Sequence, residues 1–154
     1  MVDRRHGEVT GIVDDFVVRR ADGAPAYQVA VVVDDDDQGV GEVVRGDDLL
    51  DTTPRQAWLA RRLGVGVPVY AHVPLVLGPD GQRLAKRHGA VTLTDLRARG
   101  IEPPAVLGAV AASLGLARPG SPVGSVTDLV TAFDPERVPV APWRFDPDTL
   151  AVNT

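Results

Sequence analysis

Cysteine is absent from the 154 residues, so the chain can have neither a disulfide framework nor a cysteine-based metal site. Aromatic residues are scarce at 5%, and the core must therefore be built from Val, Leu, Ala and Ile. No stretch has the roughly 18 apolar residues of a membrane span, and the first residues, MVDRRHGEV, lack the apolar segment of a signal peptide. These absences favour a globular cytoplasmic protein without a membrane partner.

Basic charge is also in short supply. The net charge is −5, which argues against a stand-alone nucleic-acid-binding protein, since these usually carry a basic excess. Three short basic strips, at 61–62, 83–87 and 97–99, are either local contacts for an anionic partner or solvated helix faces. Lysine occurs once, as Lys86, among fifteen arginines.

The first part of the chain alternates extended and helical patterns. Apolar runs at 16–18 and 27–33 flank an Asp22-Gly23 turn signal and predict a hairpin, although the second run could equally be helical. A strand is expected at 42–44. A helix should then start at Thr52 or Thr53, one of which would cap it, and end at Gly64.

A buried strand or extended segment is predicted in VPVYAHVPLVL, and the pattern changes after it. The stretches VTLTDLRARG, EPPAVLGAVAASLG and SVTDLVTAF each predict a short helix. We therefore expect an α/β protein: a sheet layer with helices, followed by a small helical region.

Arg45 and Tyr27 are candidate binding residues. Arg45 follows an apolar strand at its carboxyl end, where open α/β sheets bind ligands, and its guanidinium could grip a carboxylate in a bidentate manner. The alternative is an ion pair with Asp47 or Asp48. Tyr27 lies on an apolar run, and for this residue core packing is the alternative.

Other chemistry finds little support. The acidic run 34–37 suggests Mg²⁺, but consecutive carboxylates cannot all point at one ion, so a solvated run is the stronger interpretation. His6, His72 and His88 are scattered, and a structural role is favoured for each.

Lys86 lies in a segment that suits polyphosphate binding. The sequence PLVLGPDGQRLAKRHGAVTL, residues 74–93, runs from an apolar stretch through a Pro-Asp-Gly turn into a basic, glycine-flanked loop. A lysine on such a loop supplies a compact, mobile point charge, which a planar arginine does not replace. The alternative is a surface lysine without a role.

The same segment resembles the KMSKS region of class I aminoacyl-tRNA synthetases, with RLAKR in the place of the motif. The block that precedes this motif in the glutamyl branch resembles residues 26–56 of the chain, AYQVAVVVDDDDQGVGEVVRGDDLLDTTPRQ. The residues of this block are more similar to the glutamyl-Q tRNA(Asp) type. The resemblance extends from about His6 to the tail. It implies the carboxyl-terminal half of a Rossmann-like catalytic domain over residues 1–92, KMSKS-like loop included, and a helical carboxyl-terminal region over 93–154.

The resemblance also implies roles for residues. Tyr27 and Arg45 would bind glutamate, and Lys86 would be the catalytic residue that stabilises the phosphates of ATP. Arg83, Leu84 and Ala85 would complete the ATP-binding segment with Lys86. It further implies helical structure over part of 27–37, against the hairpin.

Several departures from the family are visible. Ala85 replaces the serine of the motif, and Arg83 replaces a lysine. The HIGH-like ATP motif of the family is absent. The cysteine-based zinc site is absent too, so no metal site is expected. The implied function is ATP- and Mg²⁺-dependent activation of glutamate and its transfer to tRNA, with tRNA(Asp) as partner and a monomeric complete enzyme, this chain alone being inactive. The alternatives are a non-catalytic remnant or binding module of the same fold, or a fragment of a discriminating glutamyl-tRNA synthetase.

Overall fold

The computed structural model describes residues 1–84 and 91–152, and it forms two compact units, Met1–Val73 and Pro74–Thr154. The predicted division between residues 92 and 93 was placed after the KMSKS-like loop, and that boundary stays a prediction. The elements of the first unit are β1 (Val2–Asp3), β2 (Gly7–Glu8), α1 (Tyr27–Asp37), β3 (Glu42–Gly46), the 3₁₀ helix η1 (Asp47–Thr52), α2 (Thr53–Leu63) and β4 (Val69–Val73).

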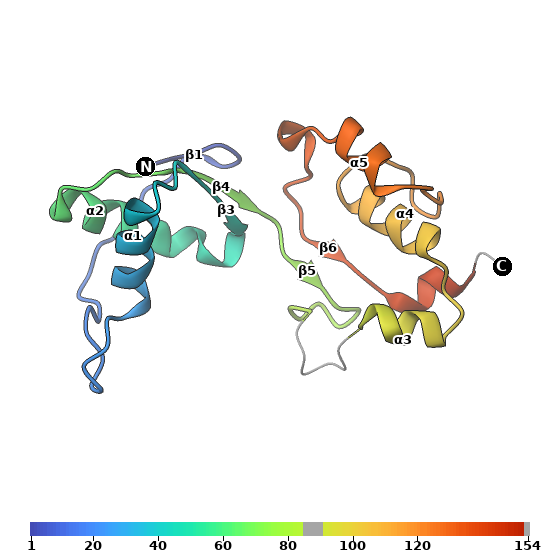
Figure 1. Cartoon of the computed structure of the whole chain (residues 1–154), viewed down its shortest axis with the longest axis horizontal. Helices are drawn as coiled ribbons and strands as arrows, with labels where there is room; N and C mark the ends of the chain where they lie inside the picture. The colour runs from blue at the N-terminus through green and yellow to red at the C-terminus, as the bar shows by residue number, and fades with distance from the viewer. Residues whose placement is uncertain (85–90, 153–154) are drawn as a thin grey trace. The chain divides into compact units, whose positions relative to one another are not determined.

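The first unit is a small sheet with two helices (Figure 1). The strand order is β2-β1-β4-β3; β4 pairs in parallel with both β1 and β3, and β2 is antiparallel to β1. Helices α1 and α2 pack together through Val32, Leu59 and Ala60. This parallel α/β arrangement is the class that the sequence predicts.

The region before β3 decides between the two predictions for 27–33. Residues 27–37 are the helix α1, so the hairpin is wrong and the helix implied by the family resemblance is confirmed. The predicted turn does form: Gly23 has φ +85°, and a single bridge pairs Arg19 with Pro25. The apolar run cannot pair beyond that bridge, because its residues pack as a helix against α2, where Val32 is buried.

Helix α2 matches its prediction except at the cap. Pro54 occupies its first turn, and Gly64 ends it in the left-handed conformation at φ +74°. Thr52 stands at the N-cap position, but its hydroxyl donates to the carbonyl oxygen of Leu49, 2.9 Å away, instead of capping α2. The reason is local: η1 runs directly into α2, so Thr52 already has helical backbone angles.

The second unit contains the three predicted helices. Its elements are β5 (Val76–Leu77), α3 (Leu93–Ala98), α4 (Pro103–Ser113), α5 (Val126–Ala132), the 3₁₀ helix η3 (Pro135–Arg137), β6 (Trp143–Arg144) and η4 (Pro147–Val152). A capping box between Thr92 and Asp95 starts α3, and β5 pairs in parallel with β6. No described helix reaches the length and apolarity that a membrane crossing requires.

One face of the sheet in the first unit carries exposed apolar side chains. Strand side chains alternate between faces, and the face that carries Val2, Val44 and Val69 is exposed by 71%, 63% and 42% at these positions. β3 is also an edge strand of the sheet. Exposed apolar strands next to an unpaired edge are typical sites of self-association.

We predict that the double substitution Val44→Thr with Val69→Thr reduces self-association of the chain and leaves its thermal stability nearly unchanged. Threonine keeps the β-branched shape that suits a strand and removes exposed apolar surface. Sedimentation velocity over a concentration series measures the first effect, and circular dichroism melting measures the second.

Val43→Thr is the matched control, because Val43 is half-buried on the other face of the same strand. This variant should lose stability without any change in self-association. Equal self-association in the double variant and the unsubstituted chain would contradict the prediction.

Candidate functional site

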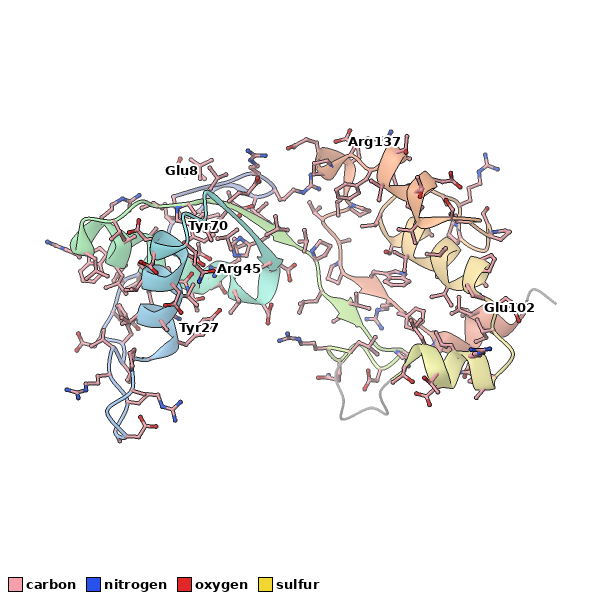
Figure 2. All side chains as sticks on the ribbon, in the orientation of Figure 1. Glu8, Tyr27, Arg45, Tyr70, Glu102 and Arg137 are labelled. Atoms are coloured by element: carbon pink, nitrogen blue, oxygen red, sulfur yellow. The ribbon has the colours of Figure 1, made fainter. Side chains whose placement is uncertain are left out.

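Arg45 stands near the carboxyl end of β3, beside the carboxyl end of β4. The two strands are parallel, and Arg45 is the register partner of His72. Side chains in register on parallel strands point to the same face, so Arg45, His72 and Tyr70 share the face opposite to the one with the exposed apolar side chains. Figure 2 shows Arg45 and Tyr70 between these strands and helix α1.

Three hydrogen bonds fix the guanidinium of Arg45. Its Nε donates to Nε2 of His72 over 3.0 Å, and its Nη2 donates to Oγ1 of Thr53 and to Oε1 of Gln56, both over 2.7 Å. The guanidinium also lies over the ring of Tyr70, 5.1 Å from the centroid. Arginine has five N–H groups, so the two on Nη1 remain, and they donate to no group among the described residues.

The partners of Arg45 are all uncharged side chains. Within the described parts of the chain, Arg45 forms no ion pair with Asp47 or Asp48, so the alternative role considered for it is wrong. A guanidinium held by neutral acceptors keeps its full positive charge, and its free N–H groups can bind an anion such as a carboxylate.

Asp3 and His72 form a buried pair behind Arg45. Oδ2 of Asp3 lies 2.6 Å from Nδ1 of His72, and both side chains are fully buried. Oδ1 of Asp3 accepts hydrogen bonds from the backbone N–H groups of Arg5 (2.9 Å) and His6 (3.0 Å). Burial raises the pKa of Asp3, but the hydrogen bonds from His72, Arg5 and His6 together outweigh it, and the net pKa lies below the ordinary value.

Tyr70 completes the buried face of β4. Its ring stacks on that of His72 with centroids 6.0 Å apart, and it is 2% exposed. Burial raises the pKa of its hydroxyl, the charge of Asp35 raises it further, and the charge of Arg45 acts in the opposite direction. Tyr70 is therefore neutral at physiological pH.

Tyr27 opens helix α1 and is 54% exposed, so the core-packing alternative for it is wrong. Figure 2 labels both side chains, Tyr27 at the start of α1 and Arg45 on β3. The next residue, Gln28, accepts a hydrogen bond of 2.7 Å from Gln56, which also binds Arg45. The start of α1 is thus linked to Arg45 by two side chains.

The KMSKS-like segment belongs to the second unit. The predicted Pro-Asp-Gly turn is present: Gly81 has φ +77°, and N of Gly78 donates to the carbonyl oxygen of Gln82 over 2.8 Å. Arg83 bridges to Leu77, and N of Leu84 donates to Val76 over 2.9 Å. Lys86 and Ala85, the other predicted residues of this segment, lie outside the described residues.

One carboxylate of the acidic run of α1 binds a backbone group. Oδ1 of Asp36 accepts a hydrogen bond of 3.1 Å from N of Gly66. Over residues 1–84 and 91–152, no three His, Asp or Glu side chains come close enough to hold a metal ion.

Sequence reasoning identified Arg45 and missed the side chains that hold it. Thr53, Gln56, His72 and Asp3 are each at most 1% exposed. Two signals could have found three of them. A histidine interrupts an apolar strand in VPVYAHV, and Thr53 and Gln56, three residues apart, share a face of the predicted helix. Asp3 carried no signal, because its partner is 69 residues away.

Comparisons with known proteins agree with this fold. Residues 1–152 match the family of tRNA synthetases class I (E and Q), catalytic domain. The chain is 58% identical over 143 residues to a glutamyl-Q tRNA(Asp) synthetase of Nocardia farcinica, covering 93% of the chain and 44% of the relative. It is 46% identical over 151 residues to a glutamate–tRNA ligase of Alkalilimnicola ehrlichii, covering 96% and 32%.

A solved structure of similar fold is a glutamate tRNA ligase from Elizabethkingia meningosepticum. It superposes with a TM-score of 0.74 at 24% identity, over 97% of this chain and 34% of that one. The sheet with an arginine at its carboxyl edge is thus part of a class I aminoacyl-tRNA synthetase catalytic domain. Within that class, the chain belongs to the family for glutamate and glutamine, and it spans less than half the length of the curated relatives it matches.

We predict that acid weakens the fold through Asp3. The pKa of Asp3 is lower in the folded chain than its ordinary value of about 3.9, so its carboxylate stabilises the fold above that pH. This contribution is lost as the pH falls through the lower folded value. Asp3→Asn should cost about 1–3 kcal/mol at pH 7, since the side-chain amide keeps one acceptor oxygen but the NH2 group replaces the oxygen that faces His72, and should flatten the dependence on acid pH.

Urea unfolding of the chain at a series of pH values between 7 and 2 measures both effects. The control is Asp37→Asn, because Asp37 is exposed at the end of α1. A stability curve for Asp3→Asn that runs parallel to that of the unsubstituted chain through the acid range would contradict the prediction.

Proposed function

We propose that this chain takes part in the ATP-dependent activation of glutamate and its transfer to tRNA, as in glutamyl-Q tRNA(Asp) synthetase. The observation that carries the proposal is the guanidinium of Arg45, fixed by neutral partners and left with the N–H groups of Nη1 for a carboxylate. The exposed Tyr27 at the start of α1 supplies a second contact to glutamate.

The proposed chemistry is direct and needs no covalent enzyme intermediate. A carboxylate oxygen of glutamate attacks the α-phosphate of ATP in line; a carboxyl–phosphate anhydride forms and pyrophosphate leaves. The contribution of the protein is orientation and charge stabilisation. Lys86, with Arg83, Leu84 and Ala85, binds the ATP phosphates in this proposal, and Mg²⁺ enters bound to ATP.

The proposed acceptor is tRNA(Asp), with glutamate going to a modified base instead of the terminal ribose. The 58% identity to the Nocardia farcinica relative supports this over a glutamate–tRNA ligase, to which identity is lower at 46%. We place the reaction in the cytoplasm, with a monomeric complete enzyme.

The proposal gives this chain only one side of the active site. It carries the KMSKS-like segment and Arg45, whereas a class I synthetase also needs the HIGH-like motif for ATP. We therefore propose that the 154 residues alone are inactive and that an amino-terminal half restores activity. The test is glutamate-dependent pyrophosphate exchange by the chain, with and without the separately expressed amino-terminal half of the Nocardia farcinica relative. Exchange by the chain alone would refute its incompleteness, and none in either case would favour a non-catalytic remnant.

In the complemented enzyme, Arg45→Ala should raise the KM for glutamate about 10- to 100-fold and leave the KM for ATP nearly unchanged. A hydrogen bond to a charged group contributes about 1.5–3 kcal/mol, and each 1.4 kcal/mol is tenfold in affinity. Tyr27→Phe should have a smaller effect in the same direction. Pyrophosphate exchange at varied glutamate concentration measures both.

Arg4→Ala is the control, since Arg4, directly after β1, forms an exposed ion pair with Glu42 of β3, 3.2 Å away. Such pairs contribute little to stability, so this variant should keep the KM for glutamate. An unchanged KM in Arg45→Ala, with a lowered melting temperature, would assign Arg45 a purely structural role.

Lys86→Ala should lower the rate of adenylate formation about 10²–10³-fold with little change in the KM for glutamate. A charge that contacts the transferring phosphates acts mainly in the transition state, so its loss affects kcat. Lys86→Arg should also be impaired, because a forked guanidinium does not replace a point charge. Exchange by Lys86→Ala within threefold of the unsubstituted enzyme would rule out this role.

A further inference from the structure

The guanidinium of Arg45 has two edges at which a carboxylate could bind, and the protein occupies one of them. Nε2 of His72 accepts from Nε, and Oγ1 of Thr53 accepts from Nη2. The two acceptor atoms are 3.1 Å apart. They therefore fill the edge between Nε and Nη2 as the two oxygens of a carboxylate would, but without a negative charge.

This arrangement determines where an anion can reach Arg45. With one edge filled and Nη2 also donating to Gln56, only the N–H groups of Nη1 are left for a ligand. Thr53, Gln56 and His72 are each at most 1% exposed, so water cannot readily take their place. The direction from which a carboxylate binds is thus set by the side chains behind the arginine.

The acceptor role of His72 depends on Asp3. Nε2 can accept from Arg45 only if the proton of the neutral ring is on Nδ1, and Nδ1 lies 2.6 Å from Oδ2 of Asp3. A ring with its proton on Nε2 would face the donor of Arg45 with another donor, and Oδ2 of Asp3 would lose the ring donor 2.6 Å away. Asp3 is itself held by the backbone N–H groups of Arg5 and His6, so the proton position is built into the fold.

We infer that His72 is a positioning residue for the glutamate site: with its proton directed to Asp3, it orients Arg45 so that only Nη1 meets the substrate carboxylate. This rests on the proposed function for the role of Arg45 in binding glutamate. The competing explanation is purely structural, with the Asp3–His72 pair only joining β1 to β4.

Two substitutions of His72 separate these explanations, because each keeps one of its two contacts. Asparagine places its amide near Nδ1 and can still donate to Asp3. Glutamine places its amide near Nε2 and can still accept from Arg45. If His72 positions Arg45, then in the complemented enzyme His72→Gln keeps the KM for glutamate within about threefold. His72→Asn raises it about tenfold, the loss of one bond to a charged group.

Stability should follow the opposite order. His72→Asn keeps the buried contact to Asp3 and should melt closer to the unsubstituted chain than His72→Gln does. The inference is supported if the variant with the better KM, His72→Gln, is the less stable one. The kcat at saturating glutamate should change little in either variant. If both variants keep the native KM, or if the KM follows the order of stability, His72 is only structural and the inference is wrong.

A measurement on the 154-residue chain keeps the inference testable where a variant does not fold or where no exchange activity is found. In nitrogen-15 NMR, the unsubstituted chain should show a coupling between Nε–H of Arg45 and an unprotonated Nε2 of His72. The proton of the ring should be on Nδ1. A ring protonated at Nε2, or an Arg45 Nε–H that exchanges as in free arginine, would overturn the inference. Absence of exchange in the complemented enzyme with this coupling present would refute the proposed function but leave the orientation of Arg45 intact.

Discussion

The buried series Asp3–His72–Arg45 is the interaction on which the first unit depends. It runs across three neighbouring parallel strands, β1, β4 and β3, and each of its members would be costly to bury alone. The polar side-chain atoms of Asp3 and His72 all have partners: Asp3 accepts from backbone N–H groups, and the ring of His72 contacts Asp3 and Arg45. Register between the strands is therefore fixed by hydrogen bonds as well as by the apolar contacts of the helices.

The same series explains how the guanidinium of Arg45 can be held by the protein at Nε and Nη2 and still offer Nη1 to an anion. An acidic partner directly on Arg45 would stabilise the guanidinium but also neutralise it. The structure instead uses a histidine, a threonine and a glutamine as acceptors and places the carboxylate one residue further back. Much of the orientation of the arginine is thereby obtained without losing its attraction for an anion, which is what a carboxylate site requires.

Much of the fold could be predicted from local signals. Pro54 and Gly64 bracket α2, Thr92 with Asp95 starts α3, and the Pro-Asp-Gly turn lies within the KMSKS-like segment. The clear local error was the hairpin at 27–33. An unbroken apolar run has no period that separates strand from helix, and the choice was made by packing of Val32 against Leu59 and Ala60 on α2.

The sequence by itself determined the alternation of strands and helices, the positions of the turns and the placing of Arg45 at the carboxyl end of a strand. These follow from spacing and from residues such as glycine and proline that act on their own backbone. Only the tertiary structure decided which groups Arg45 contacts. Asp47 and Asp48 are close to Arg45 in sequence. The side chain of Arg45 nevertheless lies against β4 and α2, where it contacts His72, Thr53 and Gln56. Asp3 joins them from 69 residues away, because pairing of β1 with β4 is a property of the sheet and not of any short segment.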